Sequence, residues 1–302
     1  MEKIREGKRE KILVTGSCGM LGAYLVSELY SDYDIIALDI RRSPFHAAWP
    51  VEYIECDITD RKRTGQRING AKPDLVIHAA AWTDVDGCEG DPDRANKVNG
   101  EGTGNVVASL KESSVPIIYI STDFVFDGKK RRSYTEDDVV GPLSVYGRSK
   151  VEGEKRVAAL KRYAIVRTSW LYGANGKNFV DAILKRAETE REFKVVDDQT
   201  GCPTYAKDLA KAIKIFIKSP WQPGIYNISN SGRVSWFGYA KEIIRSAGID
   251  GVAISPISAA ALGRPAKRPE FSVLDNGKFE HITGFVMRSW QIALKEYLGS
   301  TI

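Results

Sequence analysis

Short apolar runs alternate with longer stretches of helical periodicity through the first half of the chain. Segment 20–30 places apolar residues near helical spacing, and 91–111 is typical of a helix with Pro92 in its first turn. The apolar runs are only a few residues long, as expected for strands that are covered on both faces, and they lie at 11–14, 35–38, 51–54, 75–77 and 117–120. This repeated strand-then-helix order predicts an α/β fold with a doubly wound, Rossmann-like parallel sheet.

The regular alternation ends in the second half of the chain. Strands are predicted at 164–166 and 225–228 and a helix at 205–217, but the rest carries isolated helices and many Gly and Pro breaks. A smaller lobe is therefore expected over the carboxyl ends of the strands, where open α/β sheets bind ligands. The predicted division is a dinucleotide-binding region at 1–169 plus about 205–232, and an α/β substrate lobe at about 170–204 and 233–302.

Composition excludes several classes of protein. The 302 residues are 43% hydrophobic and 27% charged, so disorder is not the main state. Basic residues exceed acidic ones by only five and lie in scattered clusters, so no nucleic-acid partner is predicted. No apolar run approaches the roughly 18 residues that span a bilayer, and the first residues are too charged for a signal peptide. The four cysteines are far apart, as is typical of a cytoplasmic protein, and no cluster has metal-ligand spacing.

A glycine-rich segment follows the first predicted strand and opens the first helix. Gly16, Gly19 and Gly22, with Cys18 between them, have the spacing that a dinucleotide site requires. Such glycines permit a tight turn, a close backbone approach to the pyrophosphate and close packing of the helix on the sheet. The helix N-terminus adds amide donors and a favourable dipole. The segment therefore predicts a dinucleotide cofactor.

The identity of that cofactor depends on the end of the second strand. Asp39 stands where an acidic side chain reaches the hydroxyls of the adenine ribose. A carboxylate repels a ribose 2′-phosphate, whereas Arg41 or Arg42 can pair with one. Both NADH and NADPH therefore stay open. Asp57 and Ile58, after the third strand, either flank the adenine ring or form a simple turn.

Three side chains predict a general acid–base site. Tyr146 and Lys150 are four residues apart and so lie on one face of a helix. An ammonium group near a phenol favours the phenolate and lowers its pKa from about 10. Thr122 ends the fifth predicted strand, which faces the nicotinamide in a doubly wound fold. It is placed to hold the substrate oxygen that Tyr146 protonates.

Together with the glycine-rich segment, Thr122, Tyr146 and Lys150 resemble the active-site set of the extended short-chain dehydrogenases/reductases. Within that superfamily the chain is similar to the dTDP-4-dehydrorhamnose reductase family. The matching stretches are 78–86, 121–128, 167–173, 198–204, and Arg268-Pro269 with Ser272 and Leu274.

The resemblance implies how a nicotinamide cofactor would be bound. Met20 and Leu21 would surround the pyrophosphate with the three glycines, and Asp57 and Ile58 would contact the adenine. Tyr146 and Lys150 would serve both catalysis and binding of the nicotinamide ribose. The remaining residues implied around the cofactor are Ala79, Ala80, Ala81 and Thr83, with Asn99 as a buttress of the active-site strands.

The resemblance also implies the reaction and the substrate contacts. The C4 ketone of dTDP-4-dehydro-6-deoxy-L-mannose would be reduced to give dTDP-L-rhamnose. Arg264 or Arg268 would face the diphosphate of the dTDP-sugar. Ala23 and Tyr24 replace a glutamate that links some relatives into metal-dependent dimers, so a monomer or a metal-independent homodimer is expected. The residues implied at the sugar are Val85, Asp86, Thr122, Asp123 and Trp170.

Two other hypotheses stay open. The same fold serves as a non-catalytic, nucleotide-binding regulatory subunit of methionine adenosyltransferase. Another 4-keto-sugar-nucleotide reductase or an epimerase would also carry the tyrosine and the lysine. Sugar 4,6-dehydratases have an Asp-Glu pair where this chain has Asp123-Phe124, so the second carboxylate needed for dehydration is absent.

Overall fold

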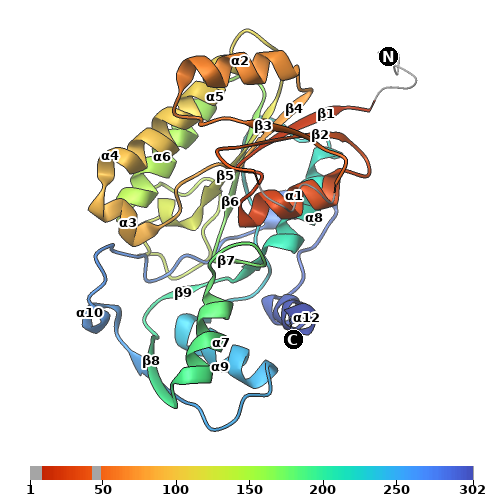
Figure 1. Cartoon of the computed structure of the whole chain (residues 1–302). Coiled ribbons are helices and arrows are strands. Elements are labelled where there is room, and N and C mark those ends of the chain that lie inside the picture. The colour runs from red at the N-terminus through yellow and green to blue at the C-terminus, as the bar shows by residue number, and fades with distance from the viewer. Residues whose placement is uncertain (1–8, 43–48, 302) are drawn as a thin grey trace.

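A computed structural model of the protein describes residues 9–42 and 49–301. Its centre is a seven-stranded sheet, all parallel, in the order β11-β6-β5-β4-β1-β2-β3 (Figure 1). Each strand falls on a predicted apolar run, so the doubly wound sheet is confirmed. The strands are β1 (Lys11–Thr15), β2 (Asp34–Asp39), β3 (Glu52–Glu55), β4 (Leu75–His78), β5 (Ile117–Thr122), β6 (Tyr163–Thr168) and β11 (Gly224–Asn227).

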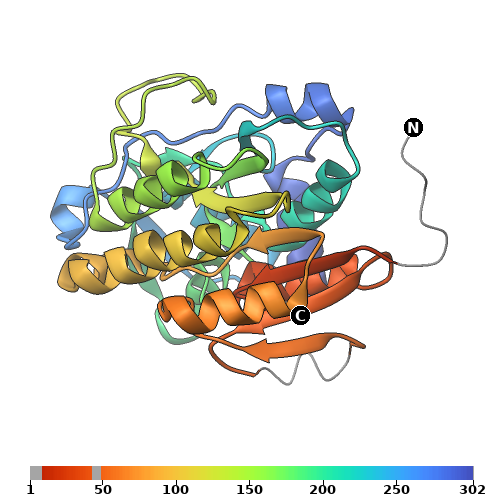
Figure 2. The ribbon, with the colours of Figure 1, turned by 90° about the horizontal axis from the view of Figure 1, so that it is seen from above.

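Helices cover both faces of this sheet. Alternate strand residues point to opposite sides, so Ile12 and Val14 pack in one core and Leu13 in the other. Because helices bury both faces of the sheet, the strands are apolar throughout and do not alternate between apolar and polar residues. One face carries α1 (Met20–Leu29), α8 (Ala206–Ile217) and α11 (Gly277–Thr283), and the other carries α2 (Arg61–Ala71), α5 (Thr103–Leu110) and α6 (Val145–Val157). Figure 2 shows α2, α5 and α6 side by side, in orange, gold and green.

The helix predicted over 91–111 is interrupted. Pro92 lies in the first turn of α4 (Pro92–Ala95), as predicted, with Asp91 as the N-cap. The chain then widens into a π-helical segment, η2 (Asn96–Gly102), before α5 begins. Such wide turns frequently mark functional sites. In this case the segment buries Asn99 completely.

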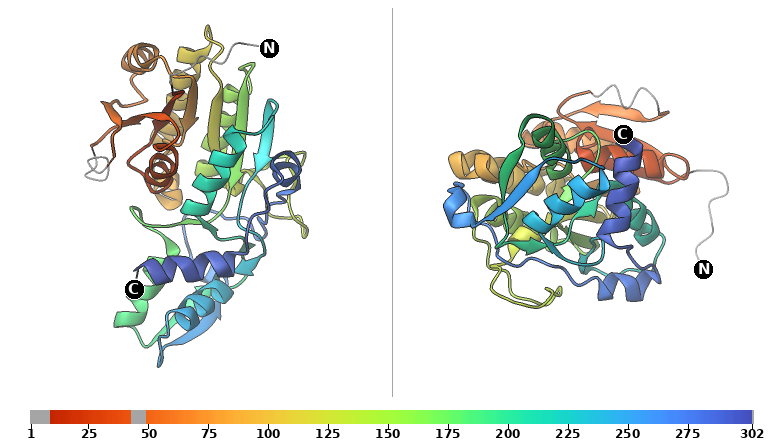
Figure 3. Two further views of the ribbon diagram at one scale, coloured as in Figure 1. Left: turned by 90° about the vertical axis from the view of Figure 1, so that its right-hand side faces the viewer. Right: turned by 90° about the horizontal axis from the view of Figure 1, so that it is seen from below.

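A second region lies beyond the carboxyl ends of the strands (Figure 3, left). It has its own core of aromatic and aliphatic side chains, which includes Tyr172, Phe193 and Trp290. Its main elements are α7 (Phe179–Thr189), α9 (Trp236–Ser246), α12 (Trp290–Thr301) and a parallel pair formed by β8 (Glu192–Val196) and β13 (Ala253–Ile257). Phe279 and Met287, which the predicted division placed in this lobe, pack instead in the core beside α8.

Short elements connect the sheet with the lobe. β7 (Leu171–Tyr172) pairs in parallel with β10 (Thr204–Tyr205), and β9 (Thr200–Gly201) pairs antiparallel with β12 (Val234–Ser235). No helix in the described ranges is both long and apolar enough to cross a bilayer. The remaining short elements of the chain are α3 (Val85–Gly90), the 3₁₀ turn η3 (Asp123–Val125) and α10 (Ala259–Leu262).

Candidate active site

A cavity of about 1200 Å³ runs from the glycine-rich loop, across the ends of β5 and β6, into the lobe. It begins where β1 and β4 lie side by side, the point at which the strand order reverses and where α/β sheets bind nucleotides. Pockets for one small ligand usually enclose about 300–1,000 Å³. The cavity therefore has room for a dinucleotide together with a second ligand.

The glycine-rich loop is shaped so that only glycine fits at its two ends. Gly16 has a φ of +67°, and a Cβ there would lie 2.6 Å from the backbone nitrogen of Ala80. A Cβ on Gly22 would lie 2.1 Å from the carbonyl oxygen of Gly16. Helix α1 starts at Met20 with Gly19 as its N-cap, and Gly16, Gly19, Met20, Leu21 and Gly22 all line the cavity. This cradle fits a pyrophosphate.

Asp39 lies against the same loop. Its carboxylate accepts hydrogen bonds from the backbone N–H of Cys18 at 2.9 Å and of Arg41 at 3.3 Å. Cys18 does not border the cavity, and its thiol donates to the carbonyl oxygen of Arg41 at 2.9 Å. Arg42 is exposed, with its guanidinium 5.5 Å from the centre of the Tyr53 ring. A carboxylate and two arginines thus stand together at the end of β2, beside the loop, and like Cys18 they do not border the cavity.

The residues predicted near the adenine form a turn. Asp57 accepts a hydrogen bond from the backbone N–H of Thr59 at 2.9 Å, just before α2 begins. Ile58 is buried, and its side chain lies against Gly102. Neither Asp57 nor Ile58 borders the cavity, so the structure does not bring these two residues together with the rest of the candidate site.

A buried chain of hydrogen bonds holds the loop after β4. Thr15 lies 2.6 Å from Nδ1 of His78, and Nε2 of His78 lies 3.0 Å from the Thr103 hydroxyl. Because the Thr103 hydroxyl donates to the carbonyl oxygen of Asn99, it accepts from His78, and Nε2 therefore carries the proton. Burial, and then the charge of Lys150, lower the pKa of His78 to about 3, so the ring is neutral.

The residues predicted around the nicotinamide lie on both sides of this loop. Ala79, Ala81 and Thr83 line the cavity, whereas Ala80 packs behind them against Gly16. Asn99 does not reach the cavity. Its amide instead bonds the backbone of Trp82 on both sides, at 2.8 and 3.0 Å, and the Ser149 hydroxyl of α6 at 2.9 Å. Asn99 therefore ties the loop after β4 to the helix that carries Tyr146.

Thr122, Tyr146 and Lys150 meet at the carboxyl end of β5 and all line the cavity. Burial raises the pKa of the Tyr146 phenol well above its usual value, although a hydrogen bond with Thr122 acts in the opposite direction. The pKa of Tyr146 is therefore raised and not lowered as predicted, because burial outweighs the effects of the neighbouring groups. The Lys150 ammonium donates instead to the carbonyl oxygen of Ile120 at 2.7 Å.

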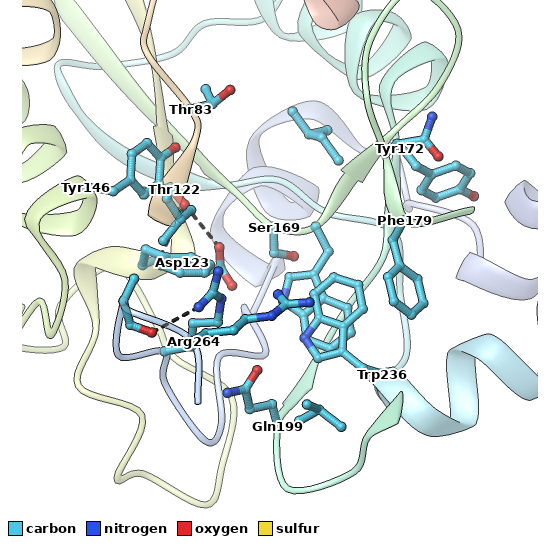
Figure 4. A pocket seen from close by; sticks show the side chains of 18 of the residues that line it. Thr83, Thr122, Asp123, Tyr146, Ser169, Tyr172, Phe179, Gln199, Trp236 and Arg264 are labelled. Atoms are coloured by element: carbon cyan, nitrogen blue, oxygen red, sulfur yellow. Dashed lines mark hydrogen bonds between the residues drawn. The ribbon is translucent and has the colours of Figure 1, made fainter. Parts of the chain in front are cut away.

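Asp123 is buried beside this set. Thr122 donates to one oxygen of its carboxyl group at 3.1 Å, and the other oxygen accepts no hydrogen bond within the described residues. Burial raises the pKa of Asp123 to about 7. Asp123 also lines the cavity, and Figure 4 shows it next to Thr122 and Tyr146. The site thus carries a carboxyl group that titrates near neutral pH.

An aromatic wall faces these groups from the lobe. Trp170 stacks on Trp236 with ring centres 3.4 Å apart and an interplanar angle of 4°. Trp170 has a φ of +46°, which is unusual for a bulky residue, and a Cβ on Gly201 would lie 2.4 Å from its indole. Figure 4 shows Phe179 and Trp236 on the side of the cavity opposite Tyr146.

The residues predicted to contact the substrate from α3 and from the segment after α10 separate into two groups. Val85 and Arg264 line the cavity, and among the described residues no carboxylate pairs with Arg264. Asp86 does not border it, because it forms a bidentate ion pair with Arg268 at 2.8 and 3.1 Å. Although burial acts to raise it, the Arg268 guanidinium holds the pKa of Asp86 below its usual value. Asp86 therefore orients Arg268, which does line the cavity.

Several lining residues were not singled out from the sequence. Phe179 and Arg186 belong to α7, and Trp236 and Tyr239 to α9. Their aromatic and basic character was visible, but their helices were predicted only as isolated segments of the lobe. Ser235 caps α9 by accepting from the N–H of Gly238, and a cap immediately before an aromatic pair was the available signal. Within the described ranges no cluster of His, Cys, Asp or Glu could hold a metal ion.

Comparisons with known proteins agree with this architecture. The family described as RmlD substrate binding domain matches residues 10–301. The spore coat polysaccharide biosynthesis protein SpsK of Bacillus subtilis is 39% identical over 290 residues, which cover 95% of this chain and 96% of that protein. The dTDP-4-dehydrorhamnose reductase of Sinorhizobium fredii is 36% identical over 291 residues, or 93% of this chain and 94% of that protein.

Solved structures give the same result in three dimensions. The crystal structure of dTDP-4-dehydrorhamnose reductase from Bacillus anthracis, in complex with NADP, matches with a TM-score of 0.88 at 35% identity. The match covers 97% of this chain and 99% of that chain. The chain therefore belongs to the RmlD substrate-binding-domain family of extended short-chain dehydrogenases/reductases.

Proposed function

We propose that this chain is a dTDP-4-dehydrorhamnose reductase, which uses NADPH or NADH to convert dTDP-4-dehydro-6-deoxy-L-mannose to dTDP-L-rhamnose. The observation that carries the proposal is the placement of Thr122, Tyr146 and Lys150 on the same cavity as the glycine-rich loop. Relatives with that name, 36% identical along nearly the whole chain, support the choice of substrate.

The residues at the sheet end of the cavity fit a nicotinamide dinucleotide. Gly16 and Gly22 leave space that any side chain would fill, and the N-terminus of α1 opens beside them. Asp39, which lies beside the loop at the end of β2, would reach the adenine ribose. Ala79 and Ala81, which line the cavity, would border the path to the nicotinamide. When bound, the reduced cofactor supplies a hydride for C4 of the sugar. Arg41 and Arg42 beside Asp39 keep both NADPH and NADH in the proposal.

Tyr146 is assigned as the proton donor to the oxygen at C4. Ketone reduction needs a neutral phenol at the start, and burial raises the pKa of Tyr146, which keeps its proton in place. The Thr122 hydroxyl, which donates to Asp123 in this structure, would instead donate to the same substrate oxygen. The charge of Lys150 would stabilise the phenolate that remains after proton transfer and would hold the nicotinamide ribose.

The lobe is assigned to the nucleotide sugar. Trp170 and Val85 border the cavity near Thr122 and would face the sugar ring. Arg264 and Arg268 enter from the segment after α10 and would pair with the diphosphate, for which a guanidinium is well suited. Figure 4 shows Arg264 extending across the middle of the cavity, between Asp123 and Trp236.

A direct assay tests the proposal. Purified protein is mixed with dTDP-4-dehydro-6-deoxy-L-mannose and either NADPH or NADH, and the absorbance of the reduced nicotinamide is followed. The expected result is cofactor oxidation, with dTDP-L-rhamnose identified by NMR. Binding of NADPH without its consumption would overturn the proposal in favour of a regulatory subunit, and a product of different stereochemistry would assign another reductase.

A further inference from the structure

A buried ion pair lies directly beneath the active-site side chains. Glu154, on α6, binds Arg167 of β6 through two hydrogen bonds of 2.9 and 2.8 Å. The side chains of Glu154 and Arg167 are only 8% and 2% exposed. The Glu154 carboxylate also accepts a hydrogen bond from the Ser121 hydroxyl at 2.6 Å. Ser121 directly precedes Thr122, so this carboxylate ties the end of β5 to α6 and β6.

Stability alone does not account for an ion pair at this depth. Removing two charges from water is so costly that apolar replacements of similar volume are often neutral or stabilising. One nitrogen of Arg167, Nη1, is buried and donates to no acceptor within the described residues, so the pair is not even fully satisfied. The cost suggests that the charge of Glu154 has a use at the site.

The negative charge of Glu154 acts electrostatically on Lys150. It lies one helical turn before Glu154 on the same face of α6, and it is 2% exposed. Its ammonium group is 4.1 Å from the centre of the Tyr119 ring and donates to the carbonyl oxygen of Ile120. Burial lowers the pKa of Lys150 to about 7, and the Glu154 carboxylate acts to raise it.

We propose that Glu154 is a positioning residue for the reduction, whose carboxylate keeps Lys150 charged in its dry surroundings and fixes the Ser121-Thr122 end of β5. This inference rests on the proposed function, because Lys150 is assigned there to the phenolate and the ribose. Glu154 itself does not line the cavity and does not contact either ligand site.

The other ionisable groups around Lys150 do not replace Glu154. From β4, His78 is neutral, with a pKa of about 3. From β5, Tyr119 is fully buried and its pKa is raised well above the usual value, so it is a neutral phenol. Tyr146 on α6 is likewise neutral. Asp123 of η3 and Cys88 of α3 act on Tyr146, and neither is among the groups that shift Lys150.

The test compares two substitutions at position 154 with a matched control. Glu154→Gln removes the charge, and Glu154→Asp keeps it on a shorter side chain. Glu152→Gln makes the same change on α6 where the carboxylate is partly exposed and paired with Arg156. The pH profile of kcat is measured for each protein. Because Lys150 must be protonated, Glu154→Gln should move the alkaline limb to lower pH by about one to two units. Glu154→Asp and Glu152→Gln should leave it near the wild-type position.

A second readout does not require turnover. NADPH binding, followed by nicotinamide fluorescence, should weaken with rising pH about one to two units earlier in Glu154→Gln than in the wild type. A purely structural role would instead lower the melting temperature of both position-154 variants and leave the pH profiles unmoved. If Glu154→Gln does not fold, Glu154→Gln combined with Arg167→Met removes both buried charges, and a smaller shift in the same direction is expected, because loss of the Arg167 cation partly offsets loss of the carboxylate.

The outcomes separate the two proposals. If the folded variant keeps both wild-type pH profiles, or if Glu154→Asp shifts them as far as Glu154→Gln does, the role of Glu154 is overturned. If the wild type binds NADPH but reduces no 4-keto sugar, the proposed function fails. The binding profile still decides the role of Glu154 in that case.

Discussion

The sheet region and the lobe are built in different ways, and this difference corresponds to different functions at the site. In the sheet region, strands buried on both faces end in short polar residues such as Thr122, which therefore lie at fixed positions. The lobe has only two-stranded sheets and depends on stacked rings such as Trp170 and Trp236. Catalytic groups need fixed positions, which the ends of the sheet strands provide. The aromatic side chains of the lobe would instead determine which substrate fits.

The largest expected effect is at Tyr146, in the sheet region. Tyr146→Phe removes the proton donor and should lower kcat by about two to four orders of magnitude, with little change in the affinity for NADPH. Steady-state kinetics and nicotinamide fluorescence measure the two effects. Tyr163→Phe, at the amino end of β6, is the matched control and should retain wild-type turnover. A Tyr146→Phe enzyme with near wild-type kcat would contradict the assignment.

The next effect tests whether the sheet region alone binds the cofactor. Gly22→Ala would push a methyl group to 2.1 Å from the carbonyl oxygen of Gly16. The free energy of unfolding should fall by about 1–3 kcal/mol, as in overpacked cores, and NADPH should bind at least about tenfold more weakly. Gly65→Ala is the control, because a Cβ there meets no atom within 4 Å and alanine favours the helix.

Chemical denaturation and fluorescence titration provide the measurements for this pair. Equal NADPH affinity in the Gly22→Ala variant would show that the loop yields easily, and the contrast between a rigid sheet and an adaptable lobe would then be lost.

A smaller effect is expected in the lobe. Trp236→Ala removes the ring that stacks on Trp170 and should raise KM for the nucleotide sugar by about tenfold, the loss expected for one aromatic contact. Because the cofactor would bind in the sheet region, the Kd for NADPH should not change. Trp221→Ala, whose ring stacks on Phe216 away from this cavity, is the control. A weaker affinity for NADPH in Trp236→Ala would break the proposed division.

The smallest effect concerns the choice between the two nicotinamide cofactors. Arg42→Ala removes an exposed guanidinium near Asp39, so binding of NADPH should weaken by about threefold to tenfold while binding of NADH is unchanged. Kd values for both cofactors measured at two salt concentrations test this. Equal losses for NADPH and NADH would mean that Arg42 does not contact the 2′-phosphate.

The sequence sufficed for those parts of the molecule that depend on local pattern. The seven strands, the glycine cradle and the shared helix face of Tyr146 and Lys150 follow from periodicity and spacing alone. The direction of the Tyr146 pKa shift did not follow, because proximity to Lys150 was counted while the burial of the phenol depends on tertiary packing. The ion pair of Asp86 with Arg268 joins residues far apart in the chain, and local spacing carries no record of it.

The π-helical segment shows the same limit in another form. Without the family resemblance, which implied a buttress, a regular helix over 91–111 would place Asn99 on the surface, whereas in the π-helical segment it is buried and bonds Trp82 and Ser149. Trp236 was missed because its helix had no visible relation to the catalytic strand ends. Contacts between the lobe and the sheet are set by the folded chain as a whole, so a single sequence does not disclose them.

The fixed proton on Nε2 of His78 makes this imidazole a spectroscopic reporter. The ring contacts the Thr15 and Thr103 hydroxyls, and its burial prevents titration near neutral pH. The ring N–H should therefore give a sharp nitrogen NMR resonance whose chemical shift does not change near neutral pH. Because the ring is fully buried between Thr15 and Thr103, this hydrogen exchanges with solvent only when the surrounding structure opens. The exchange rate of the His78 Nε2 hydrogen would therefore report how often the structure around the glycine-rich loop opens.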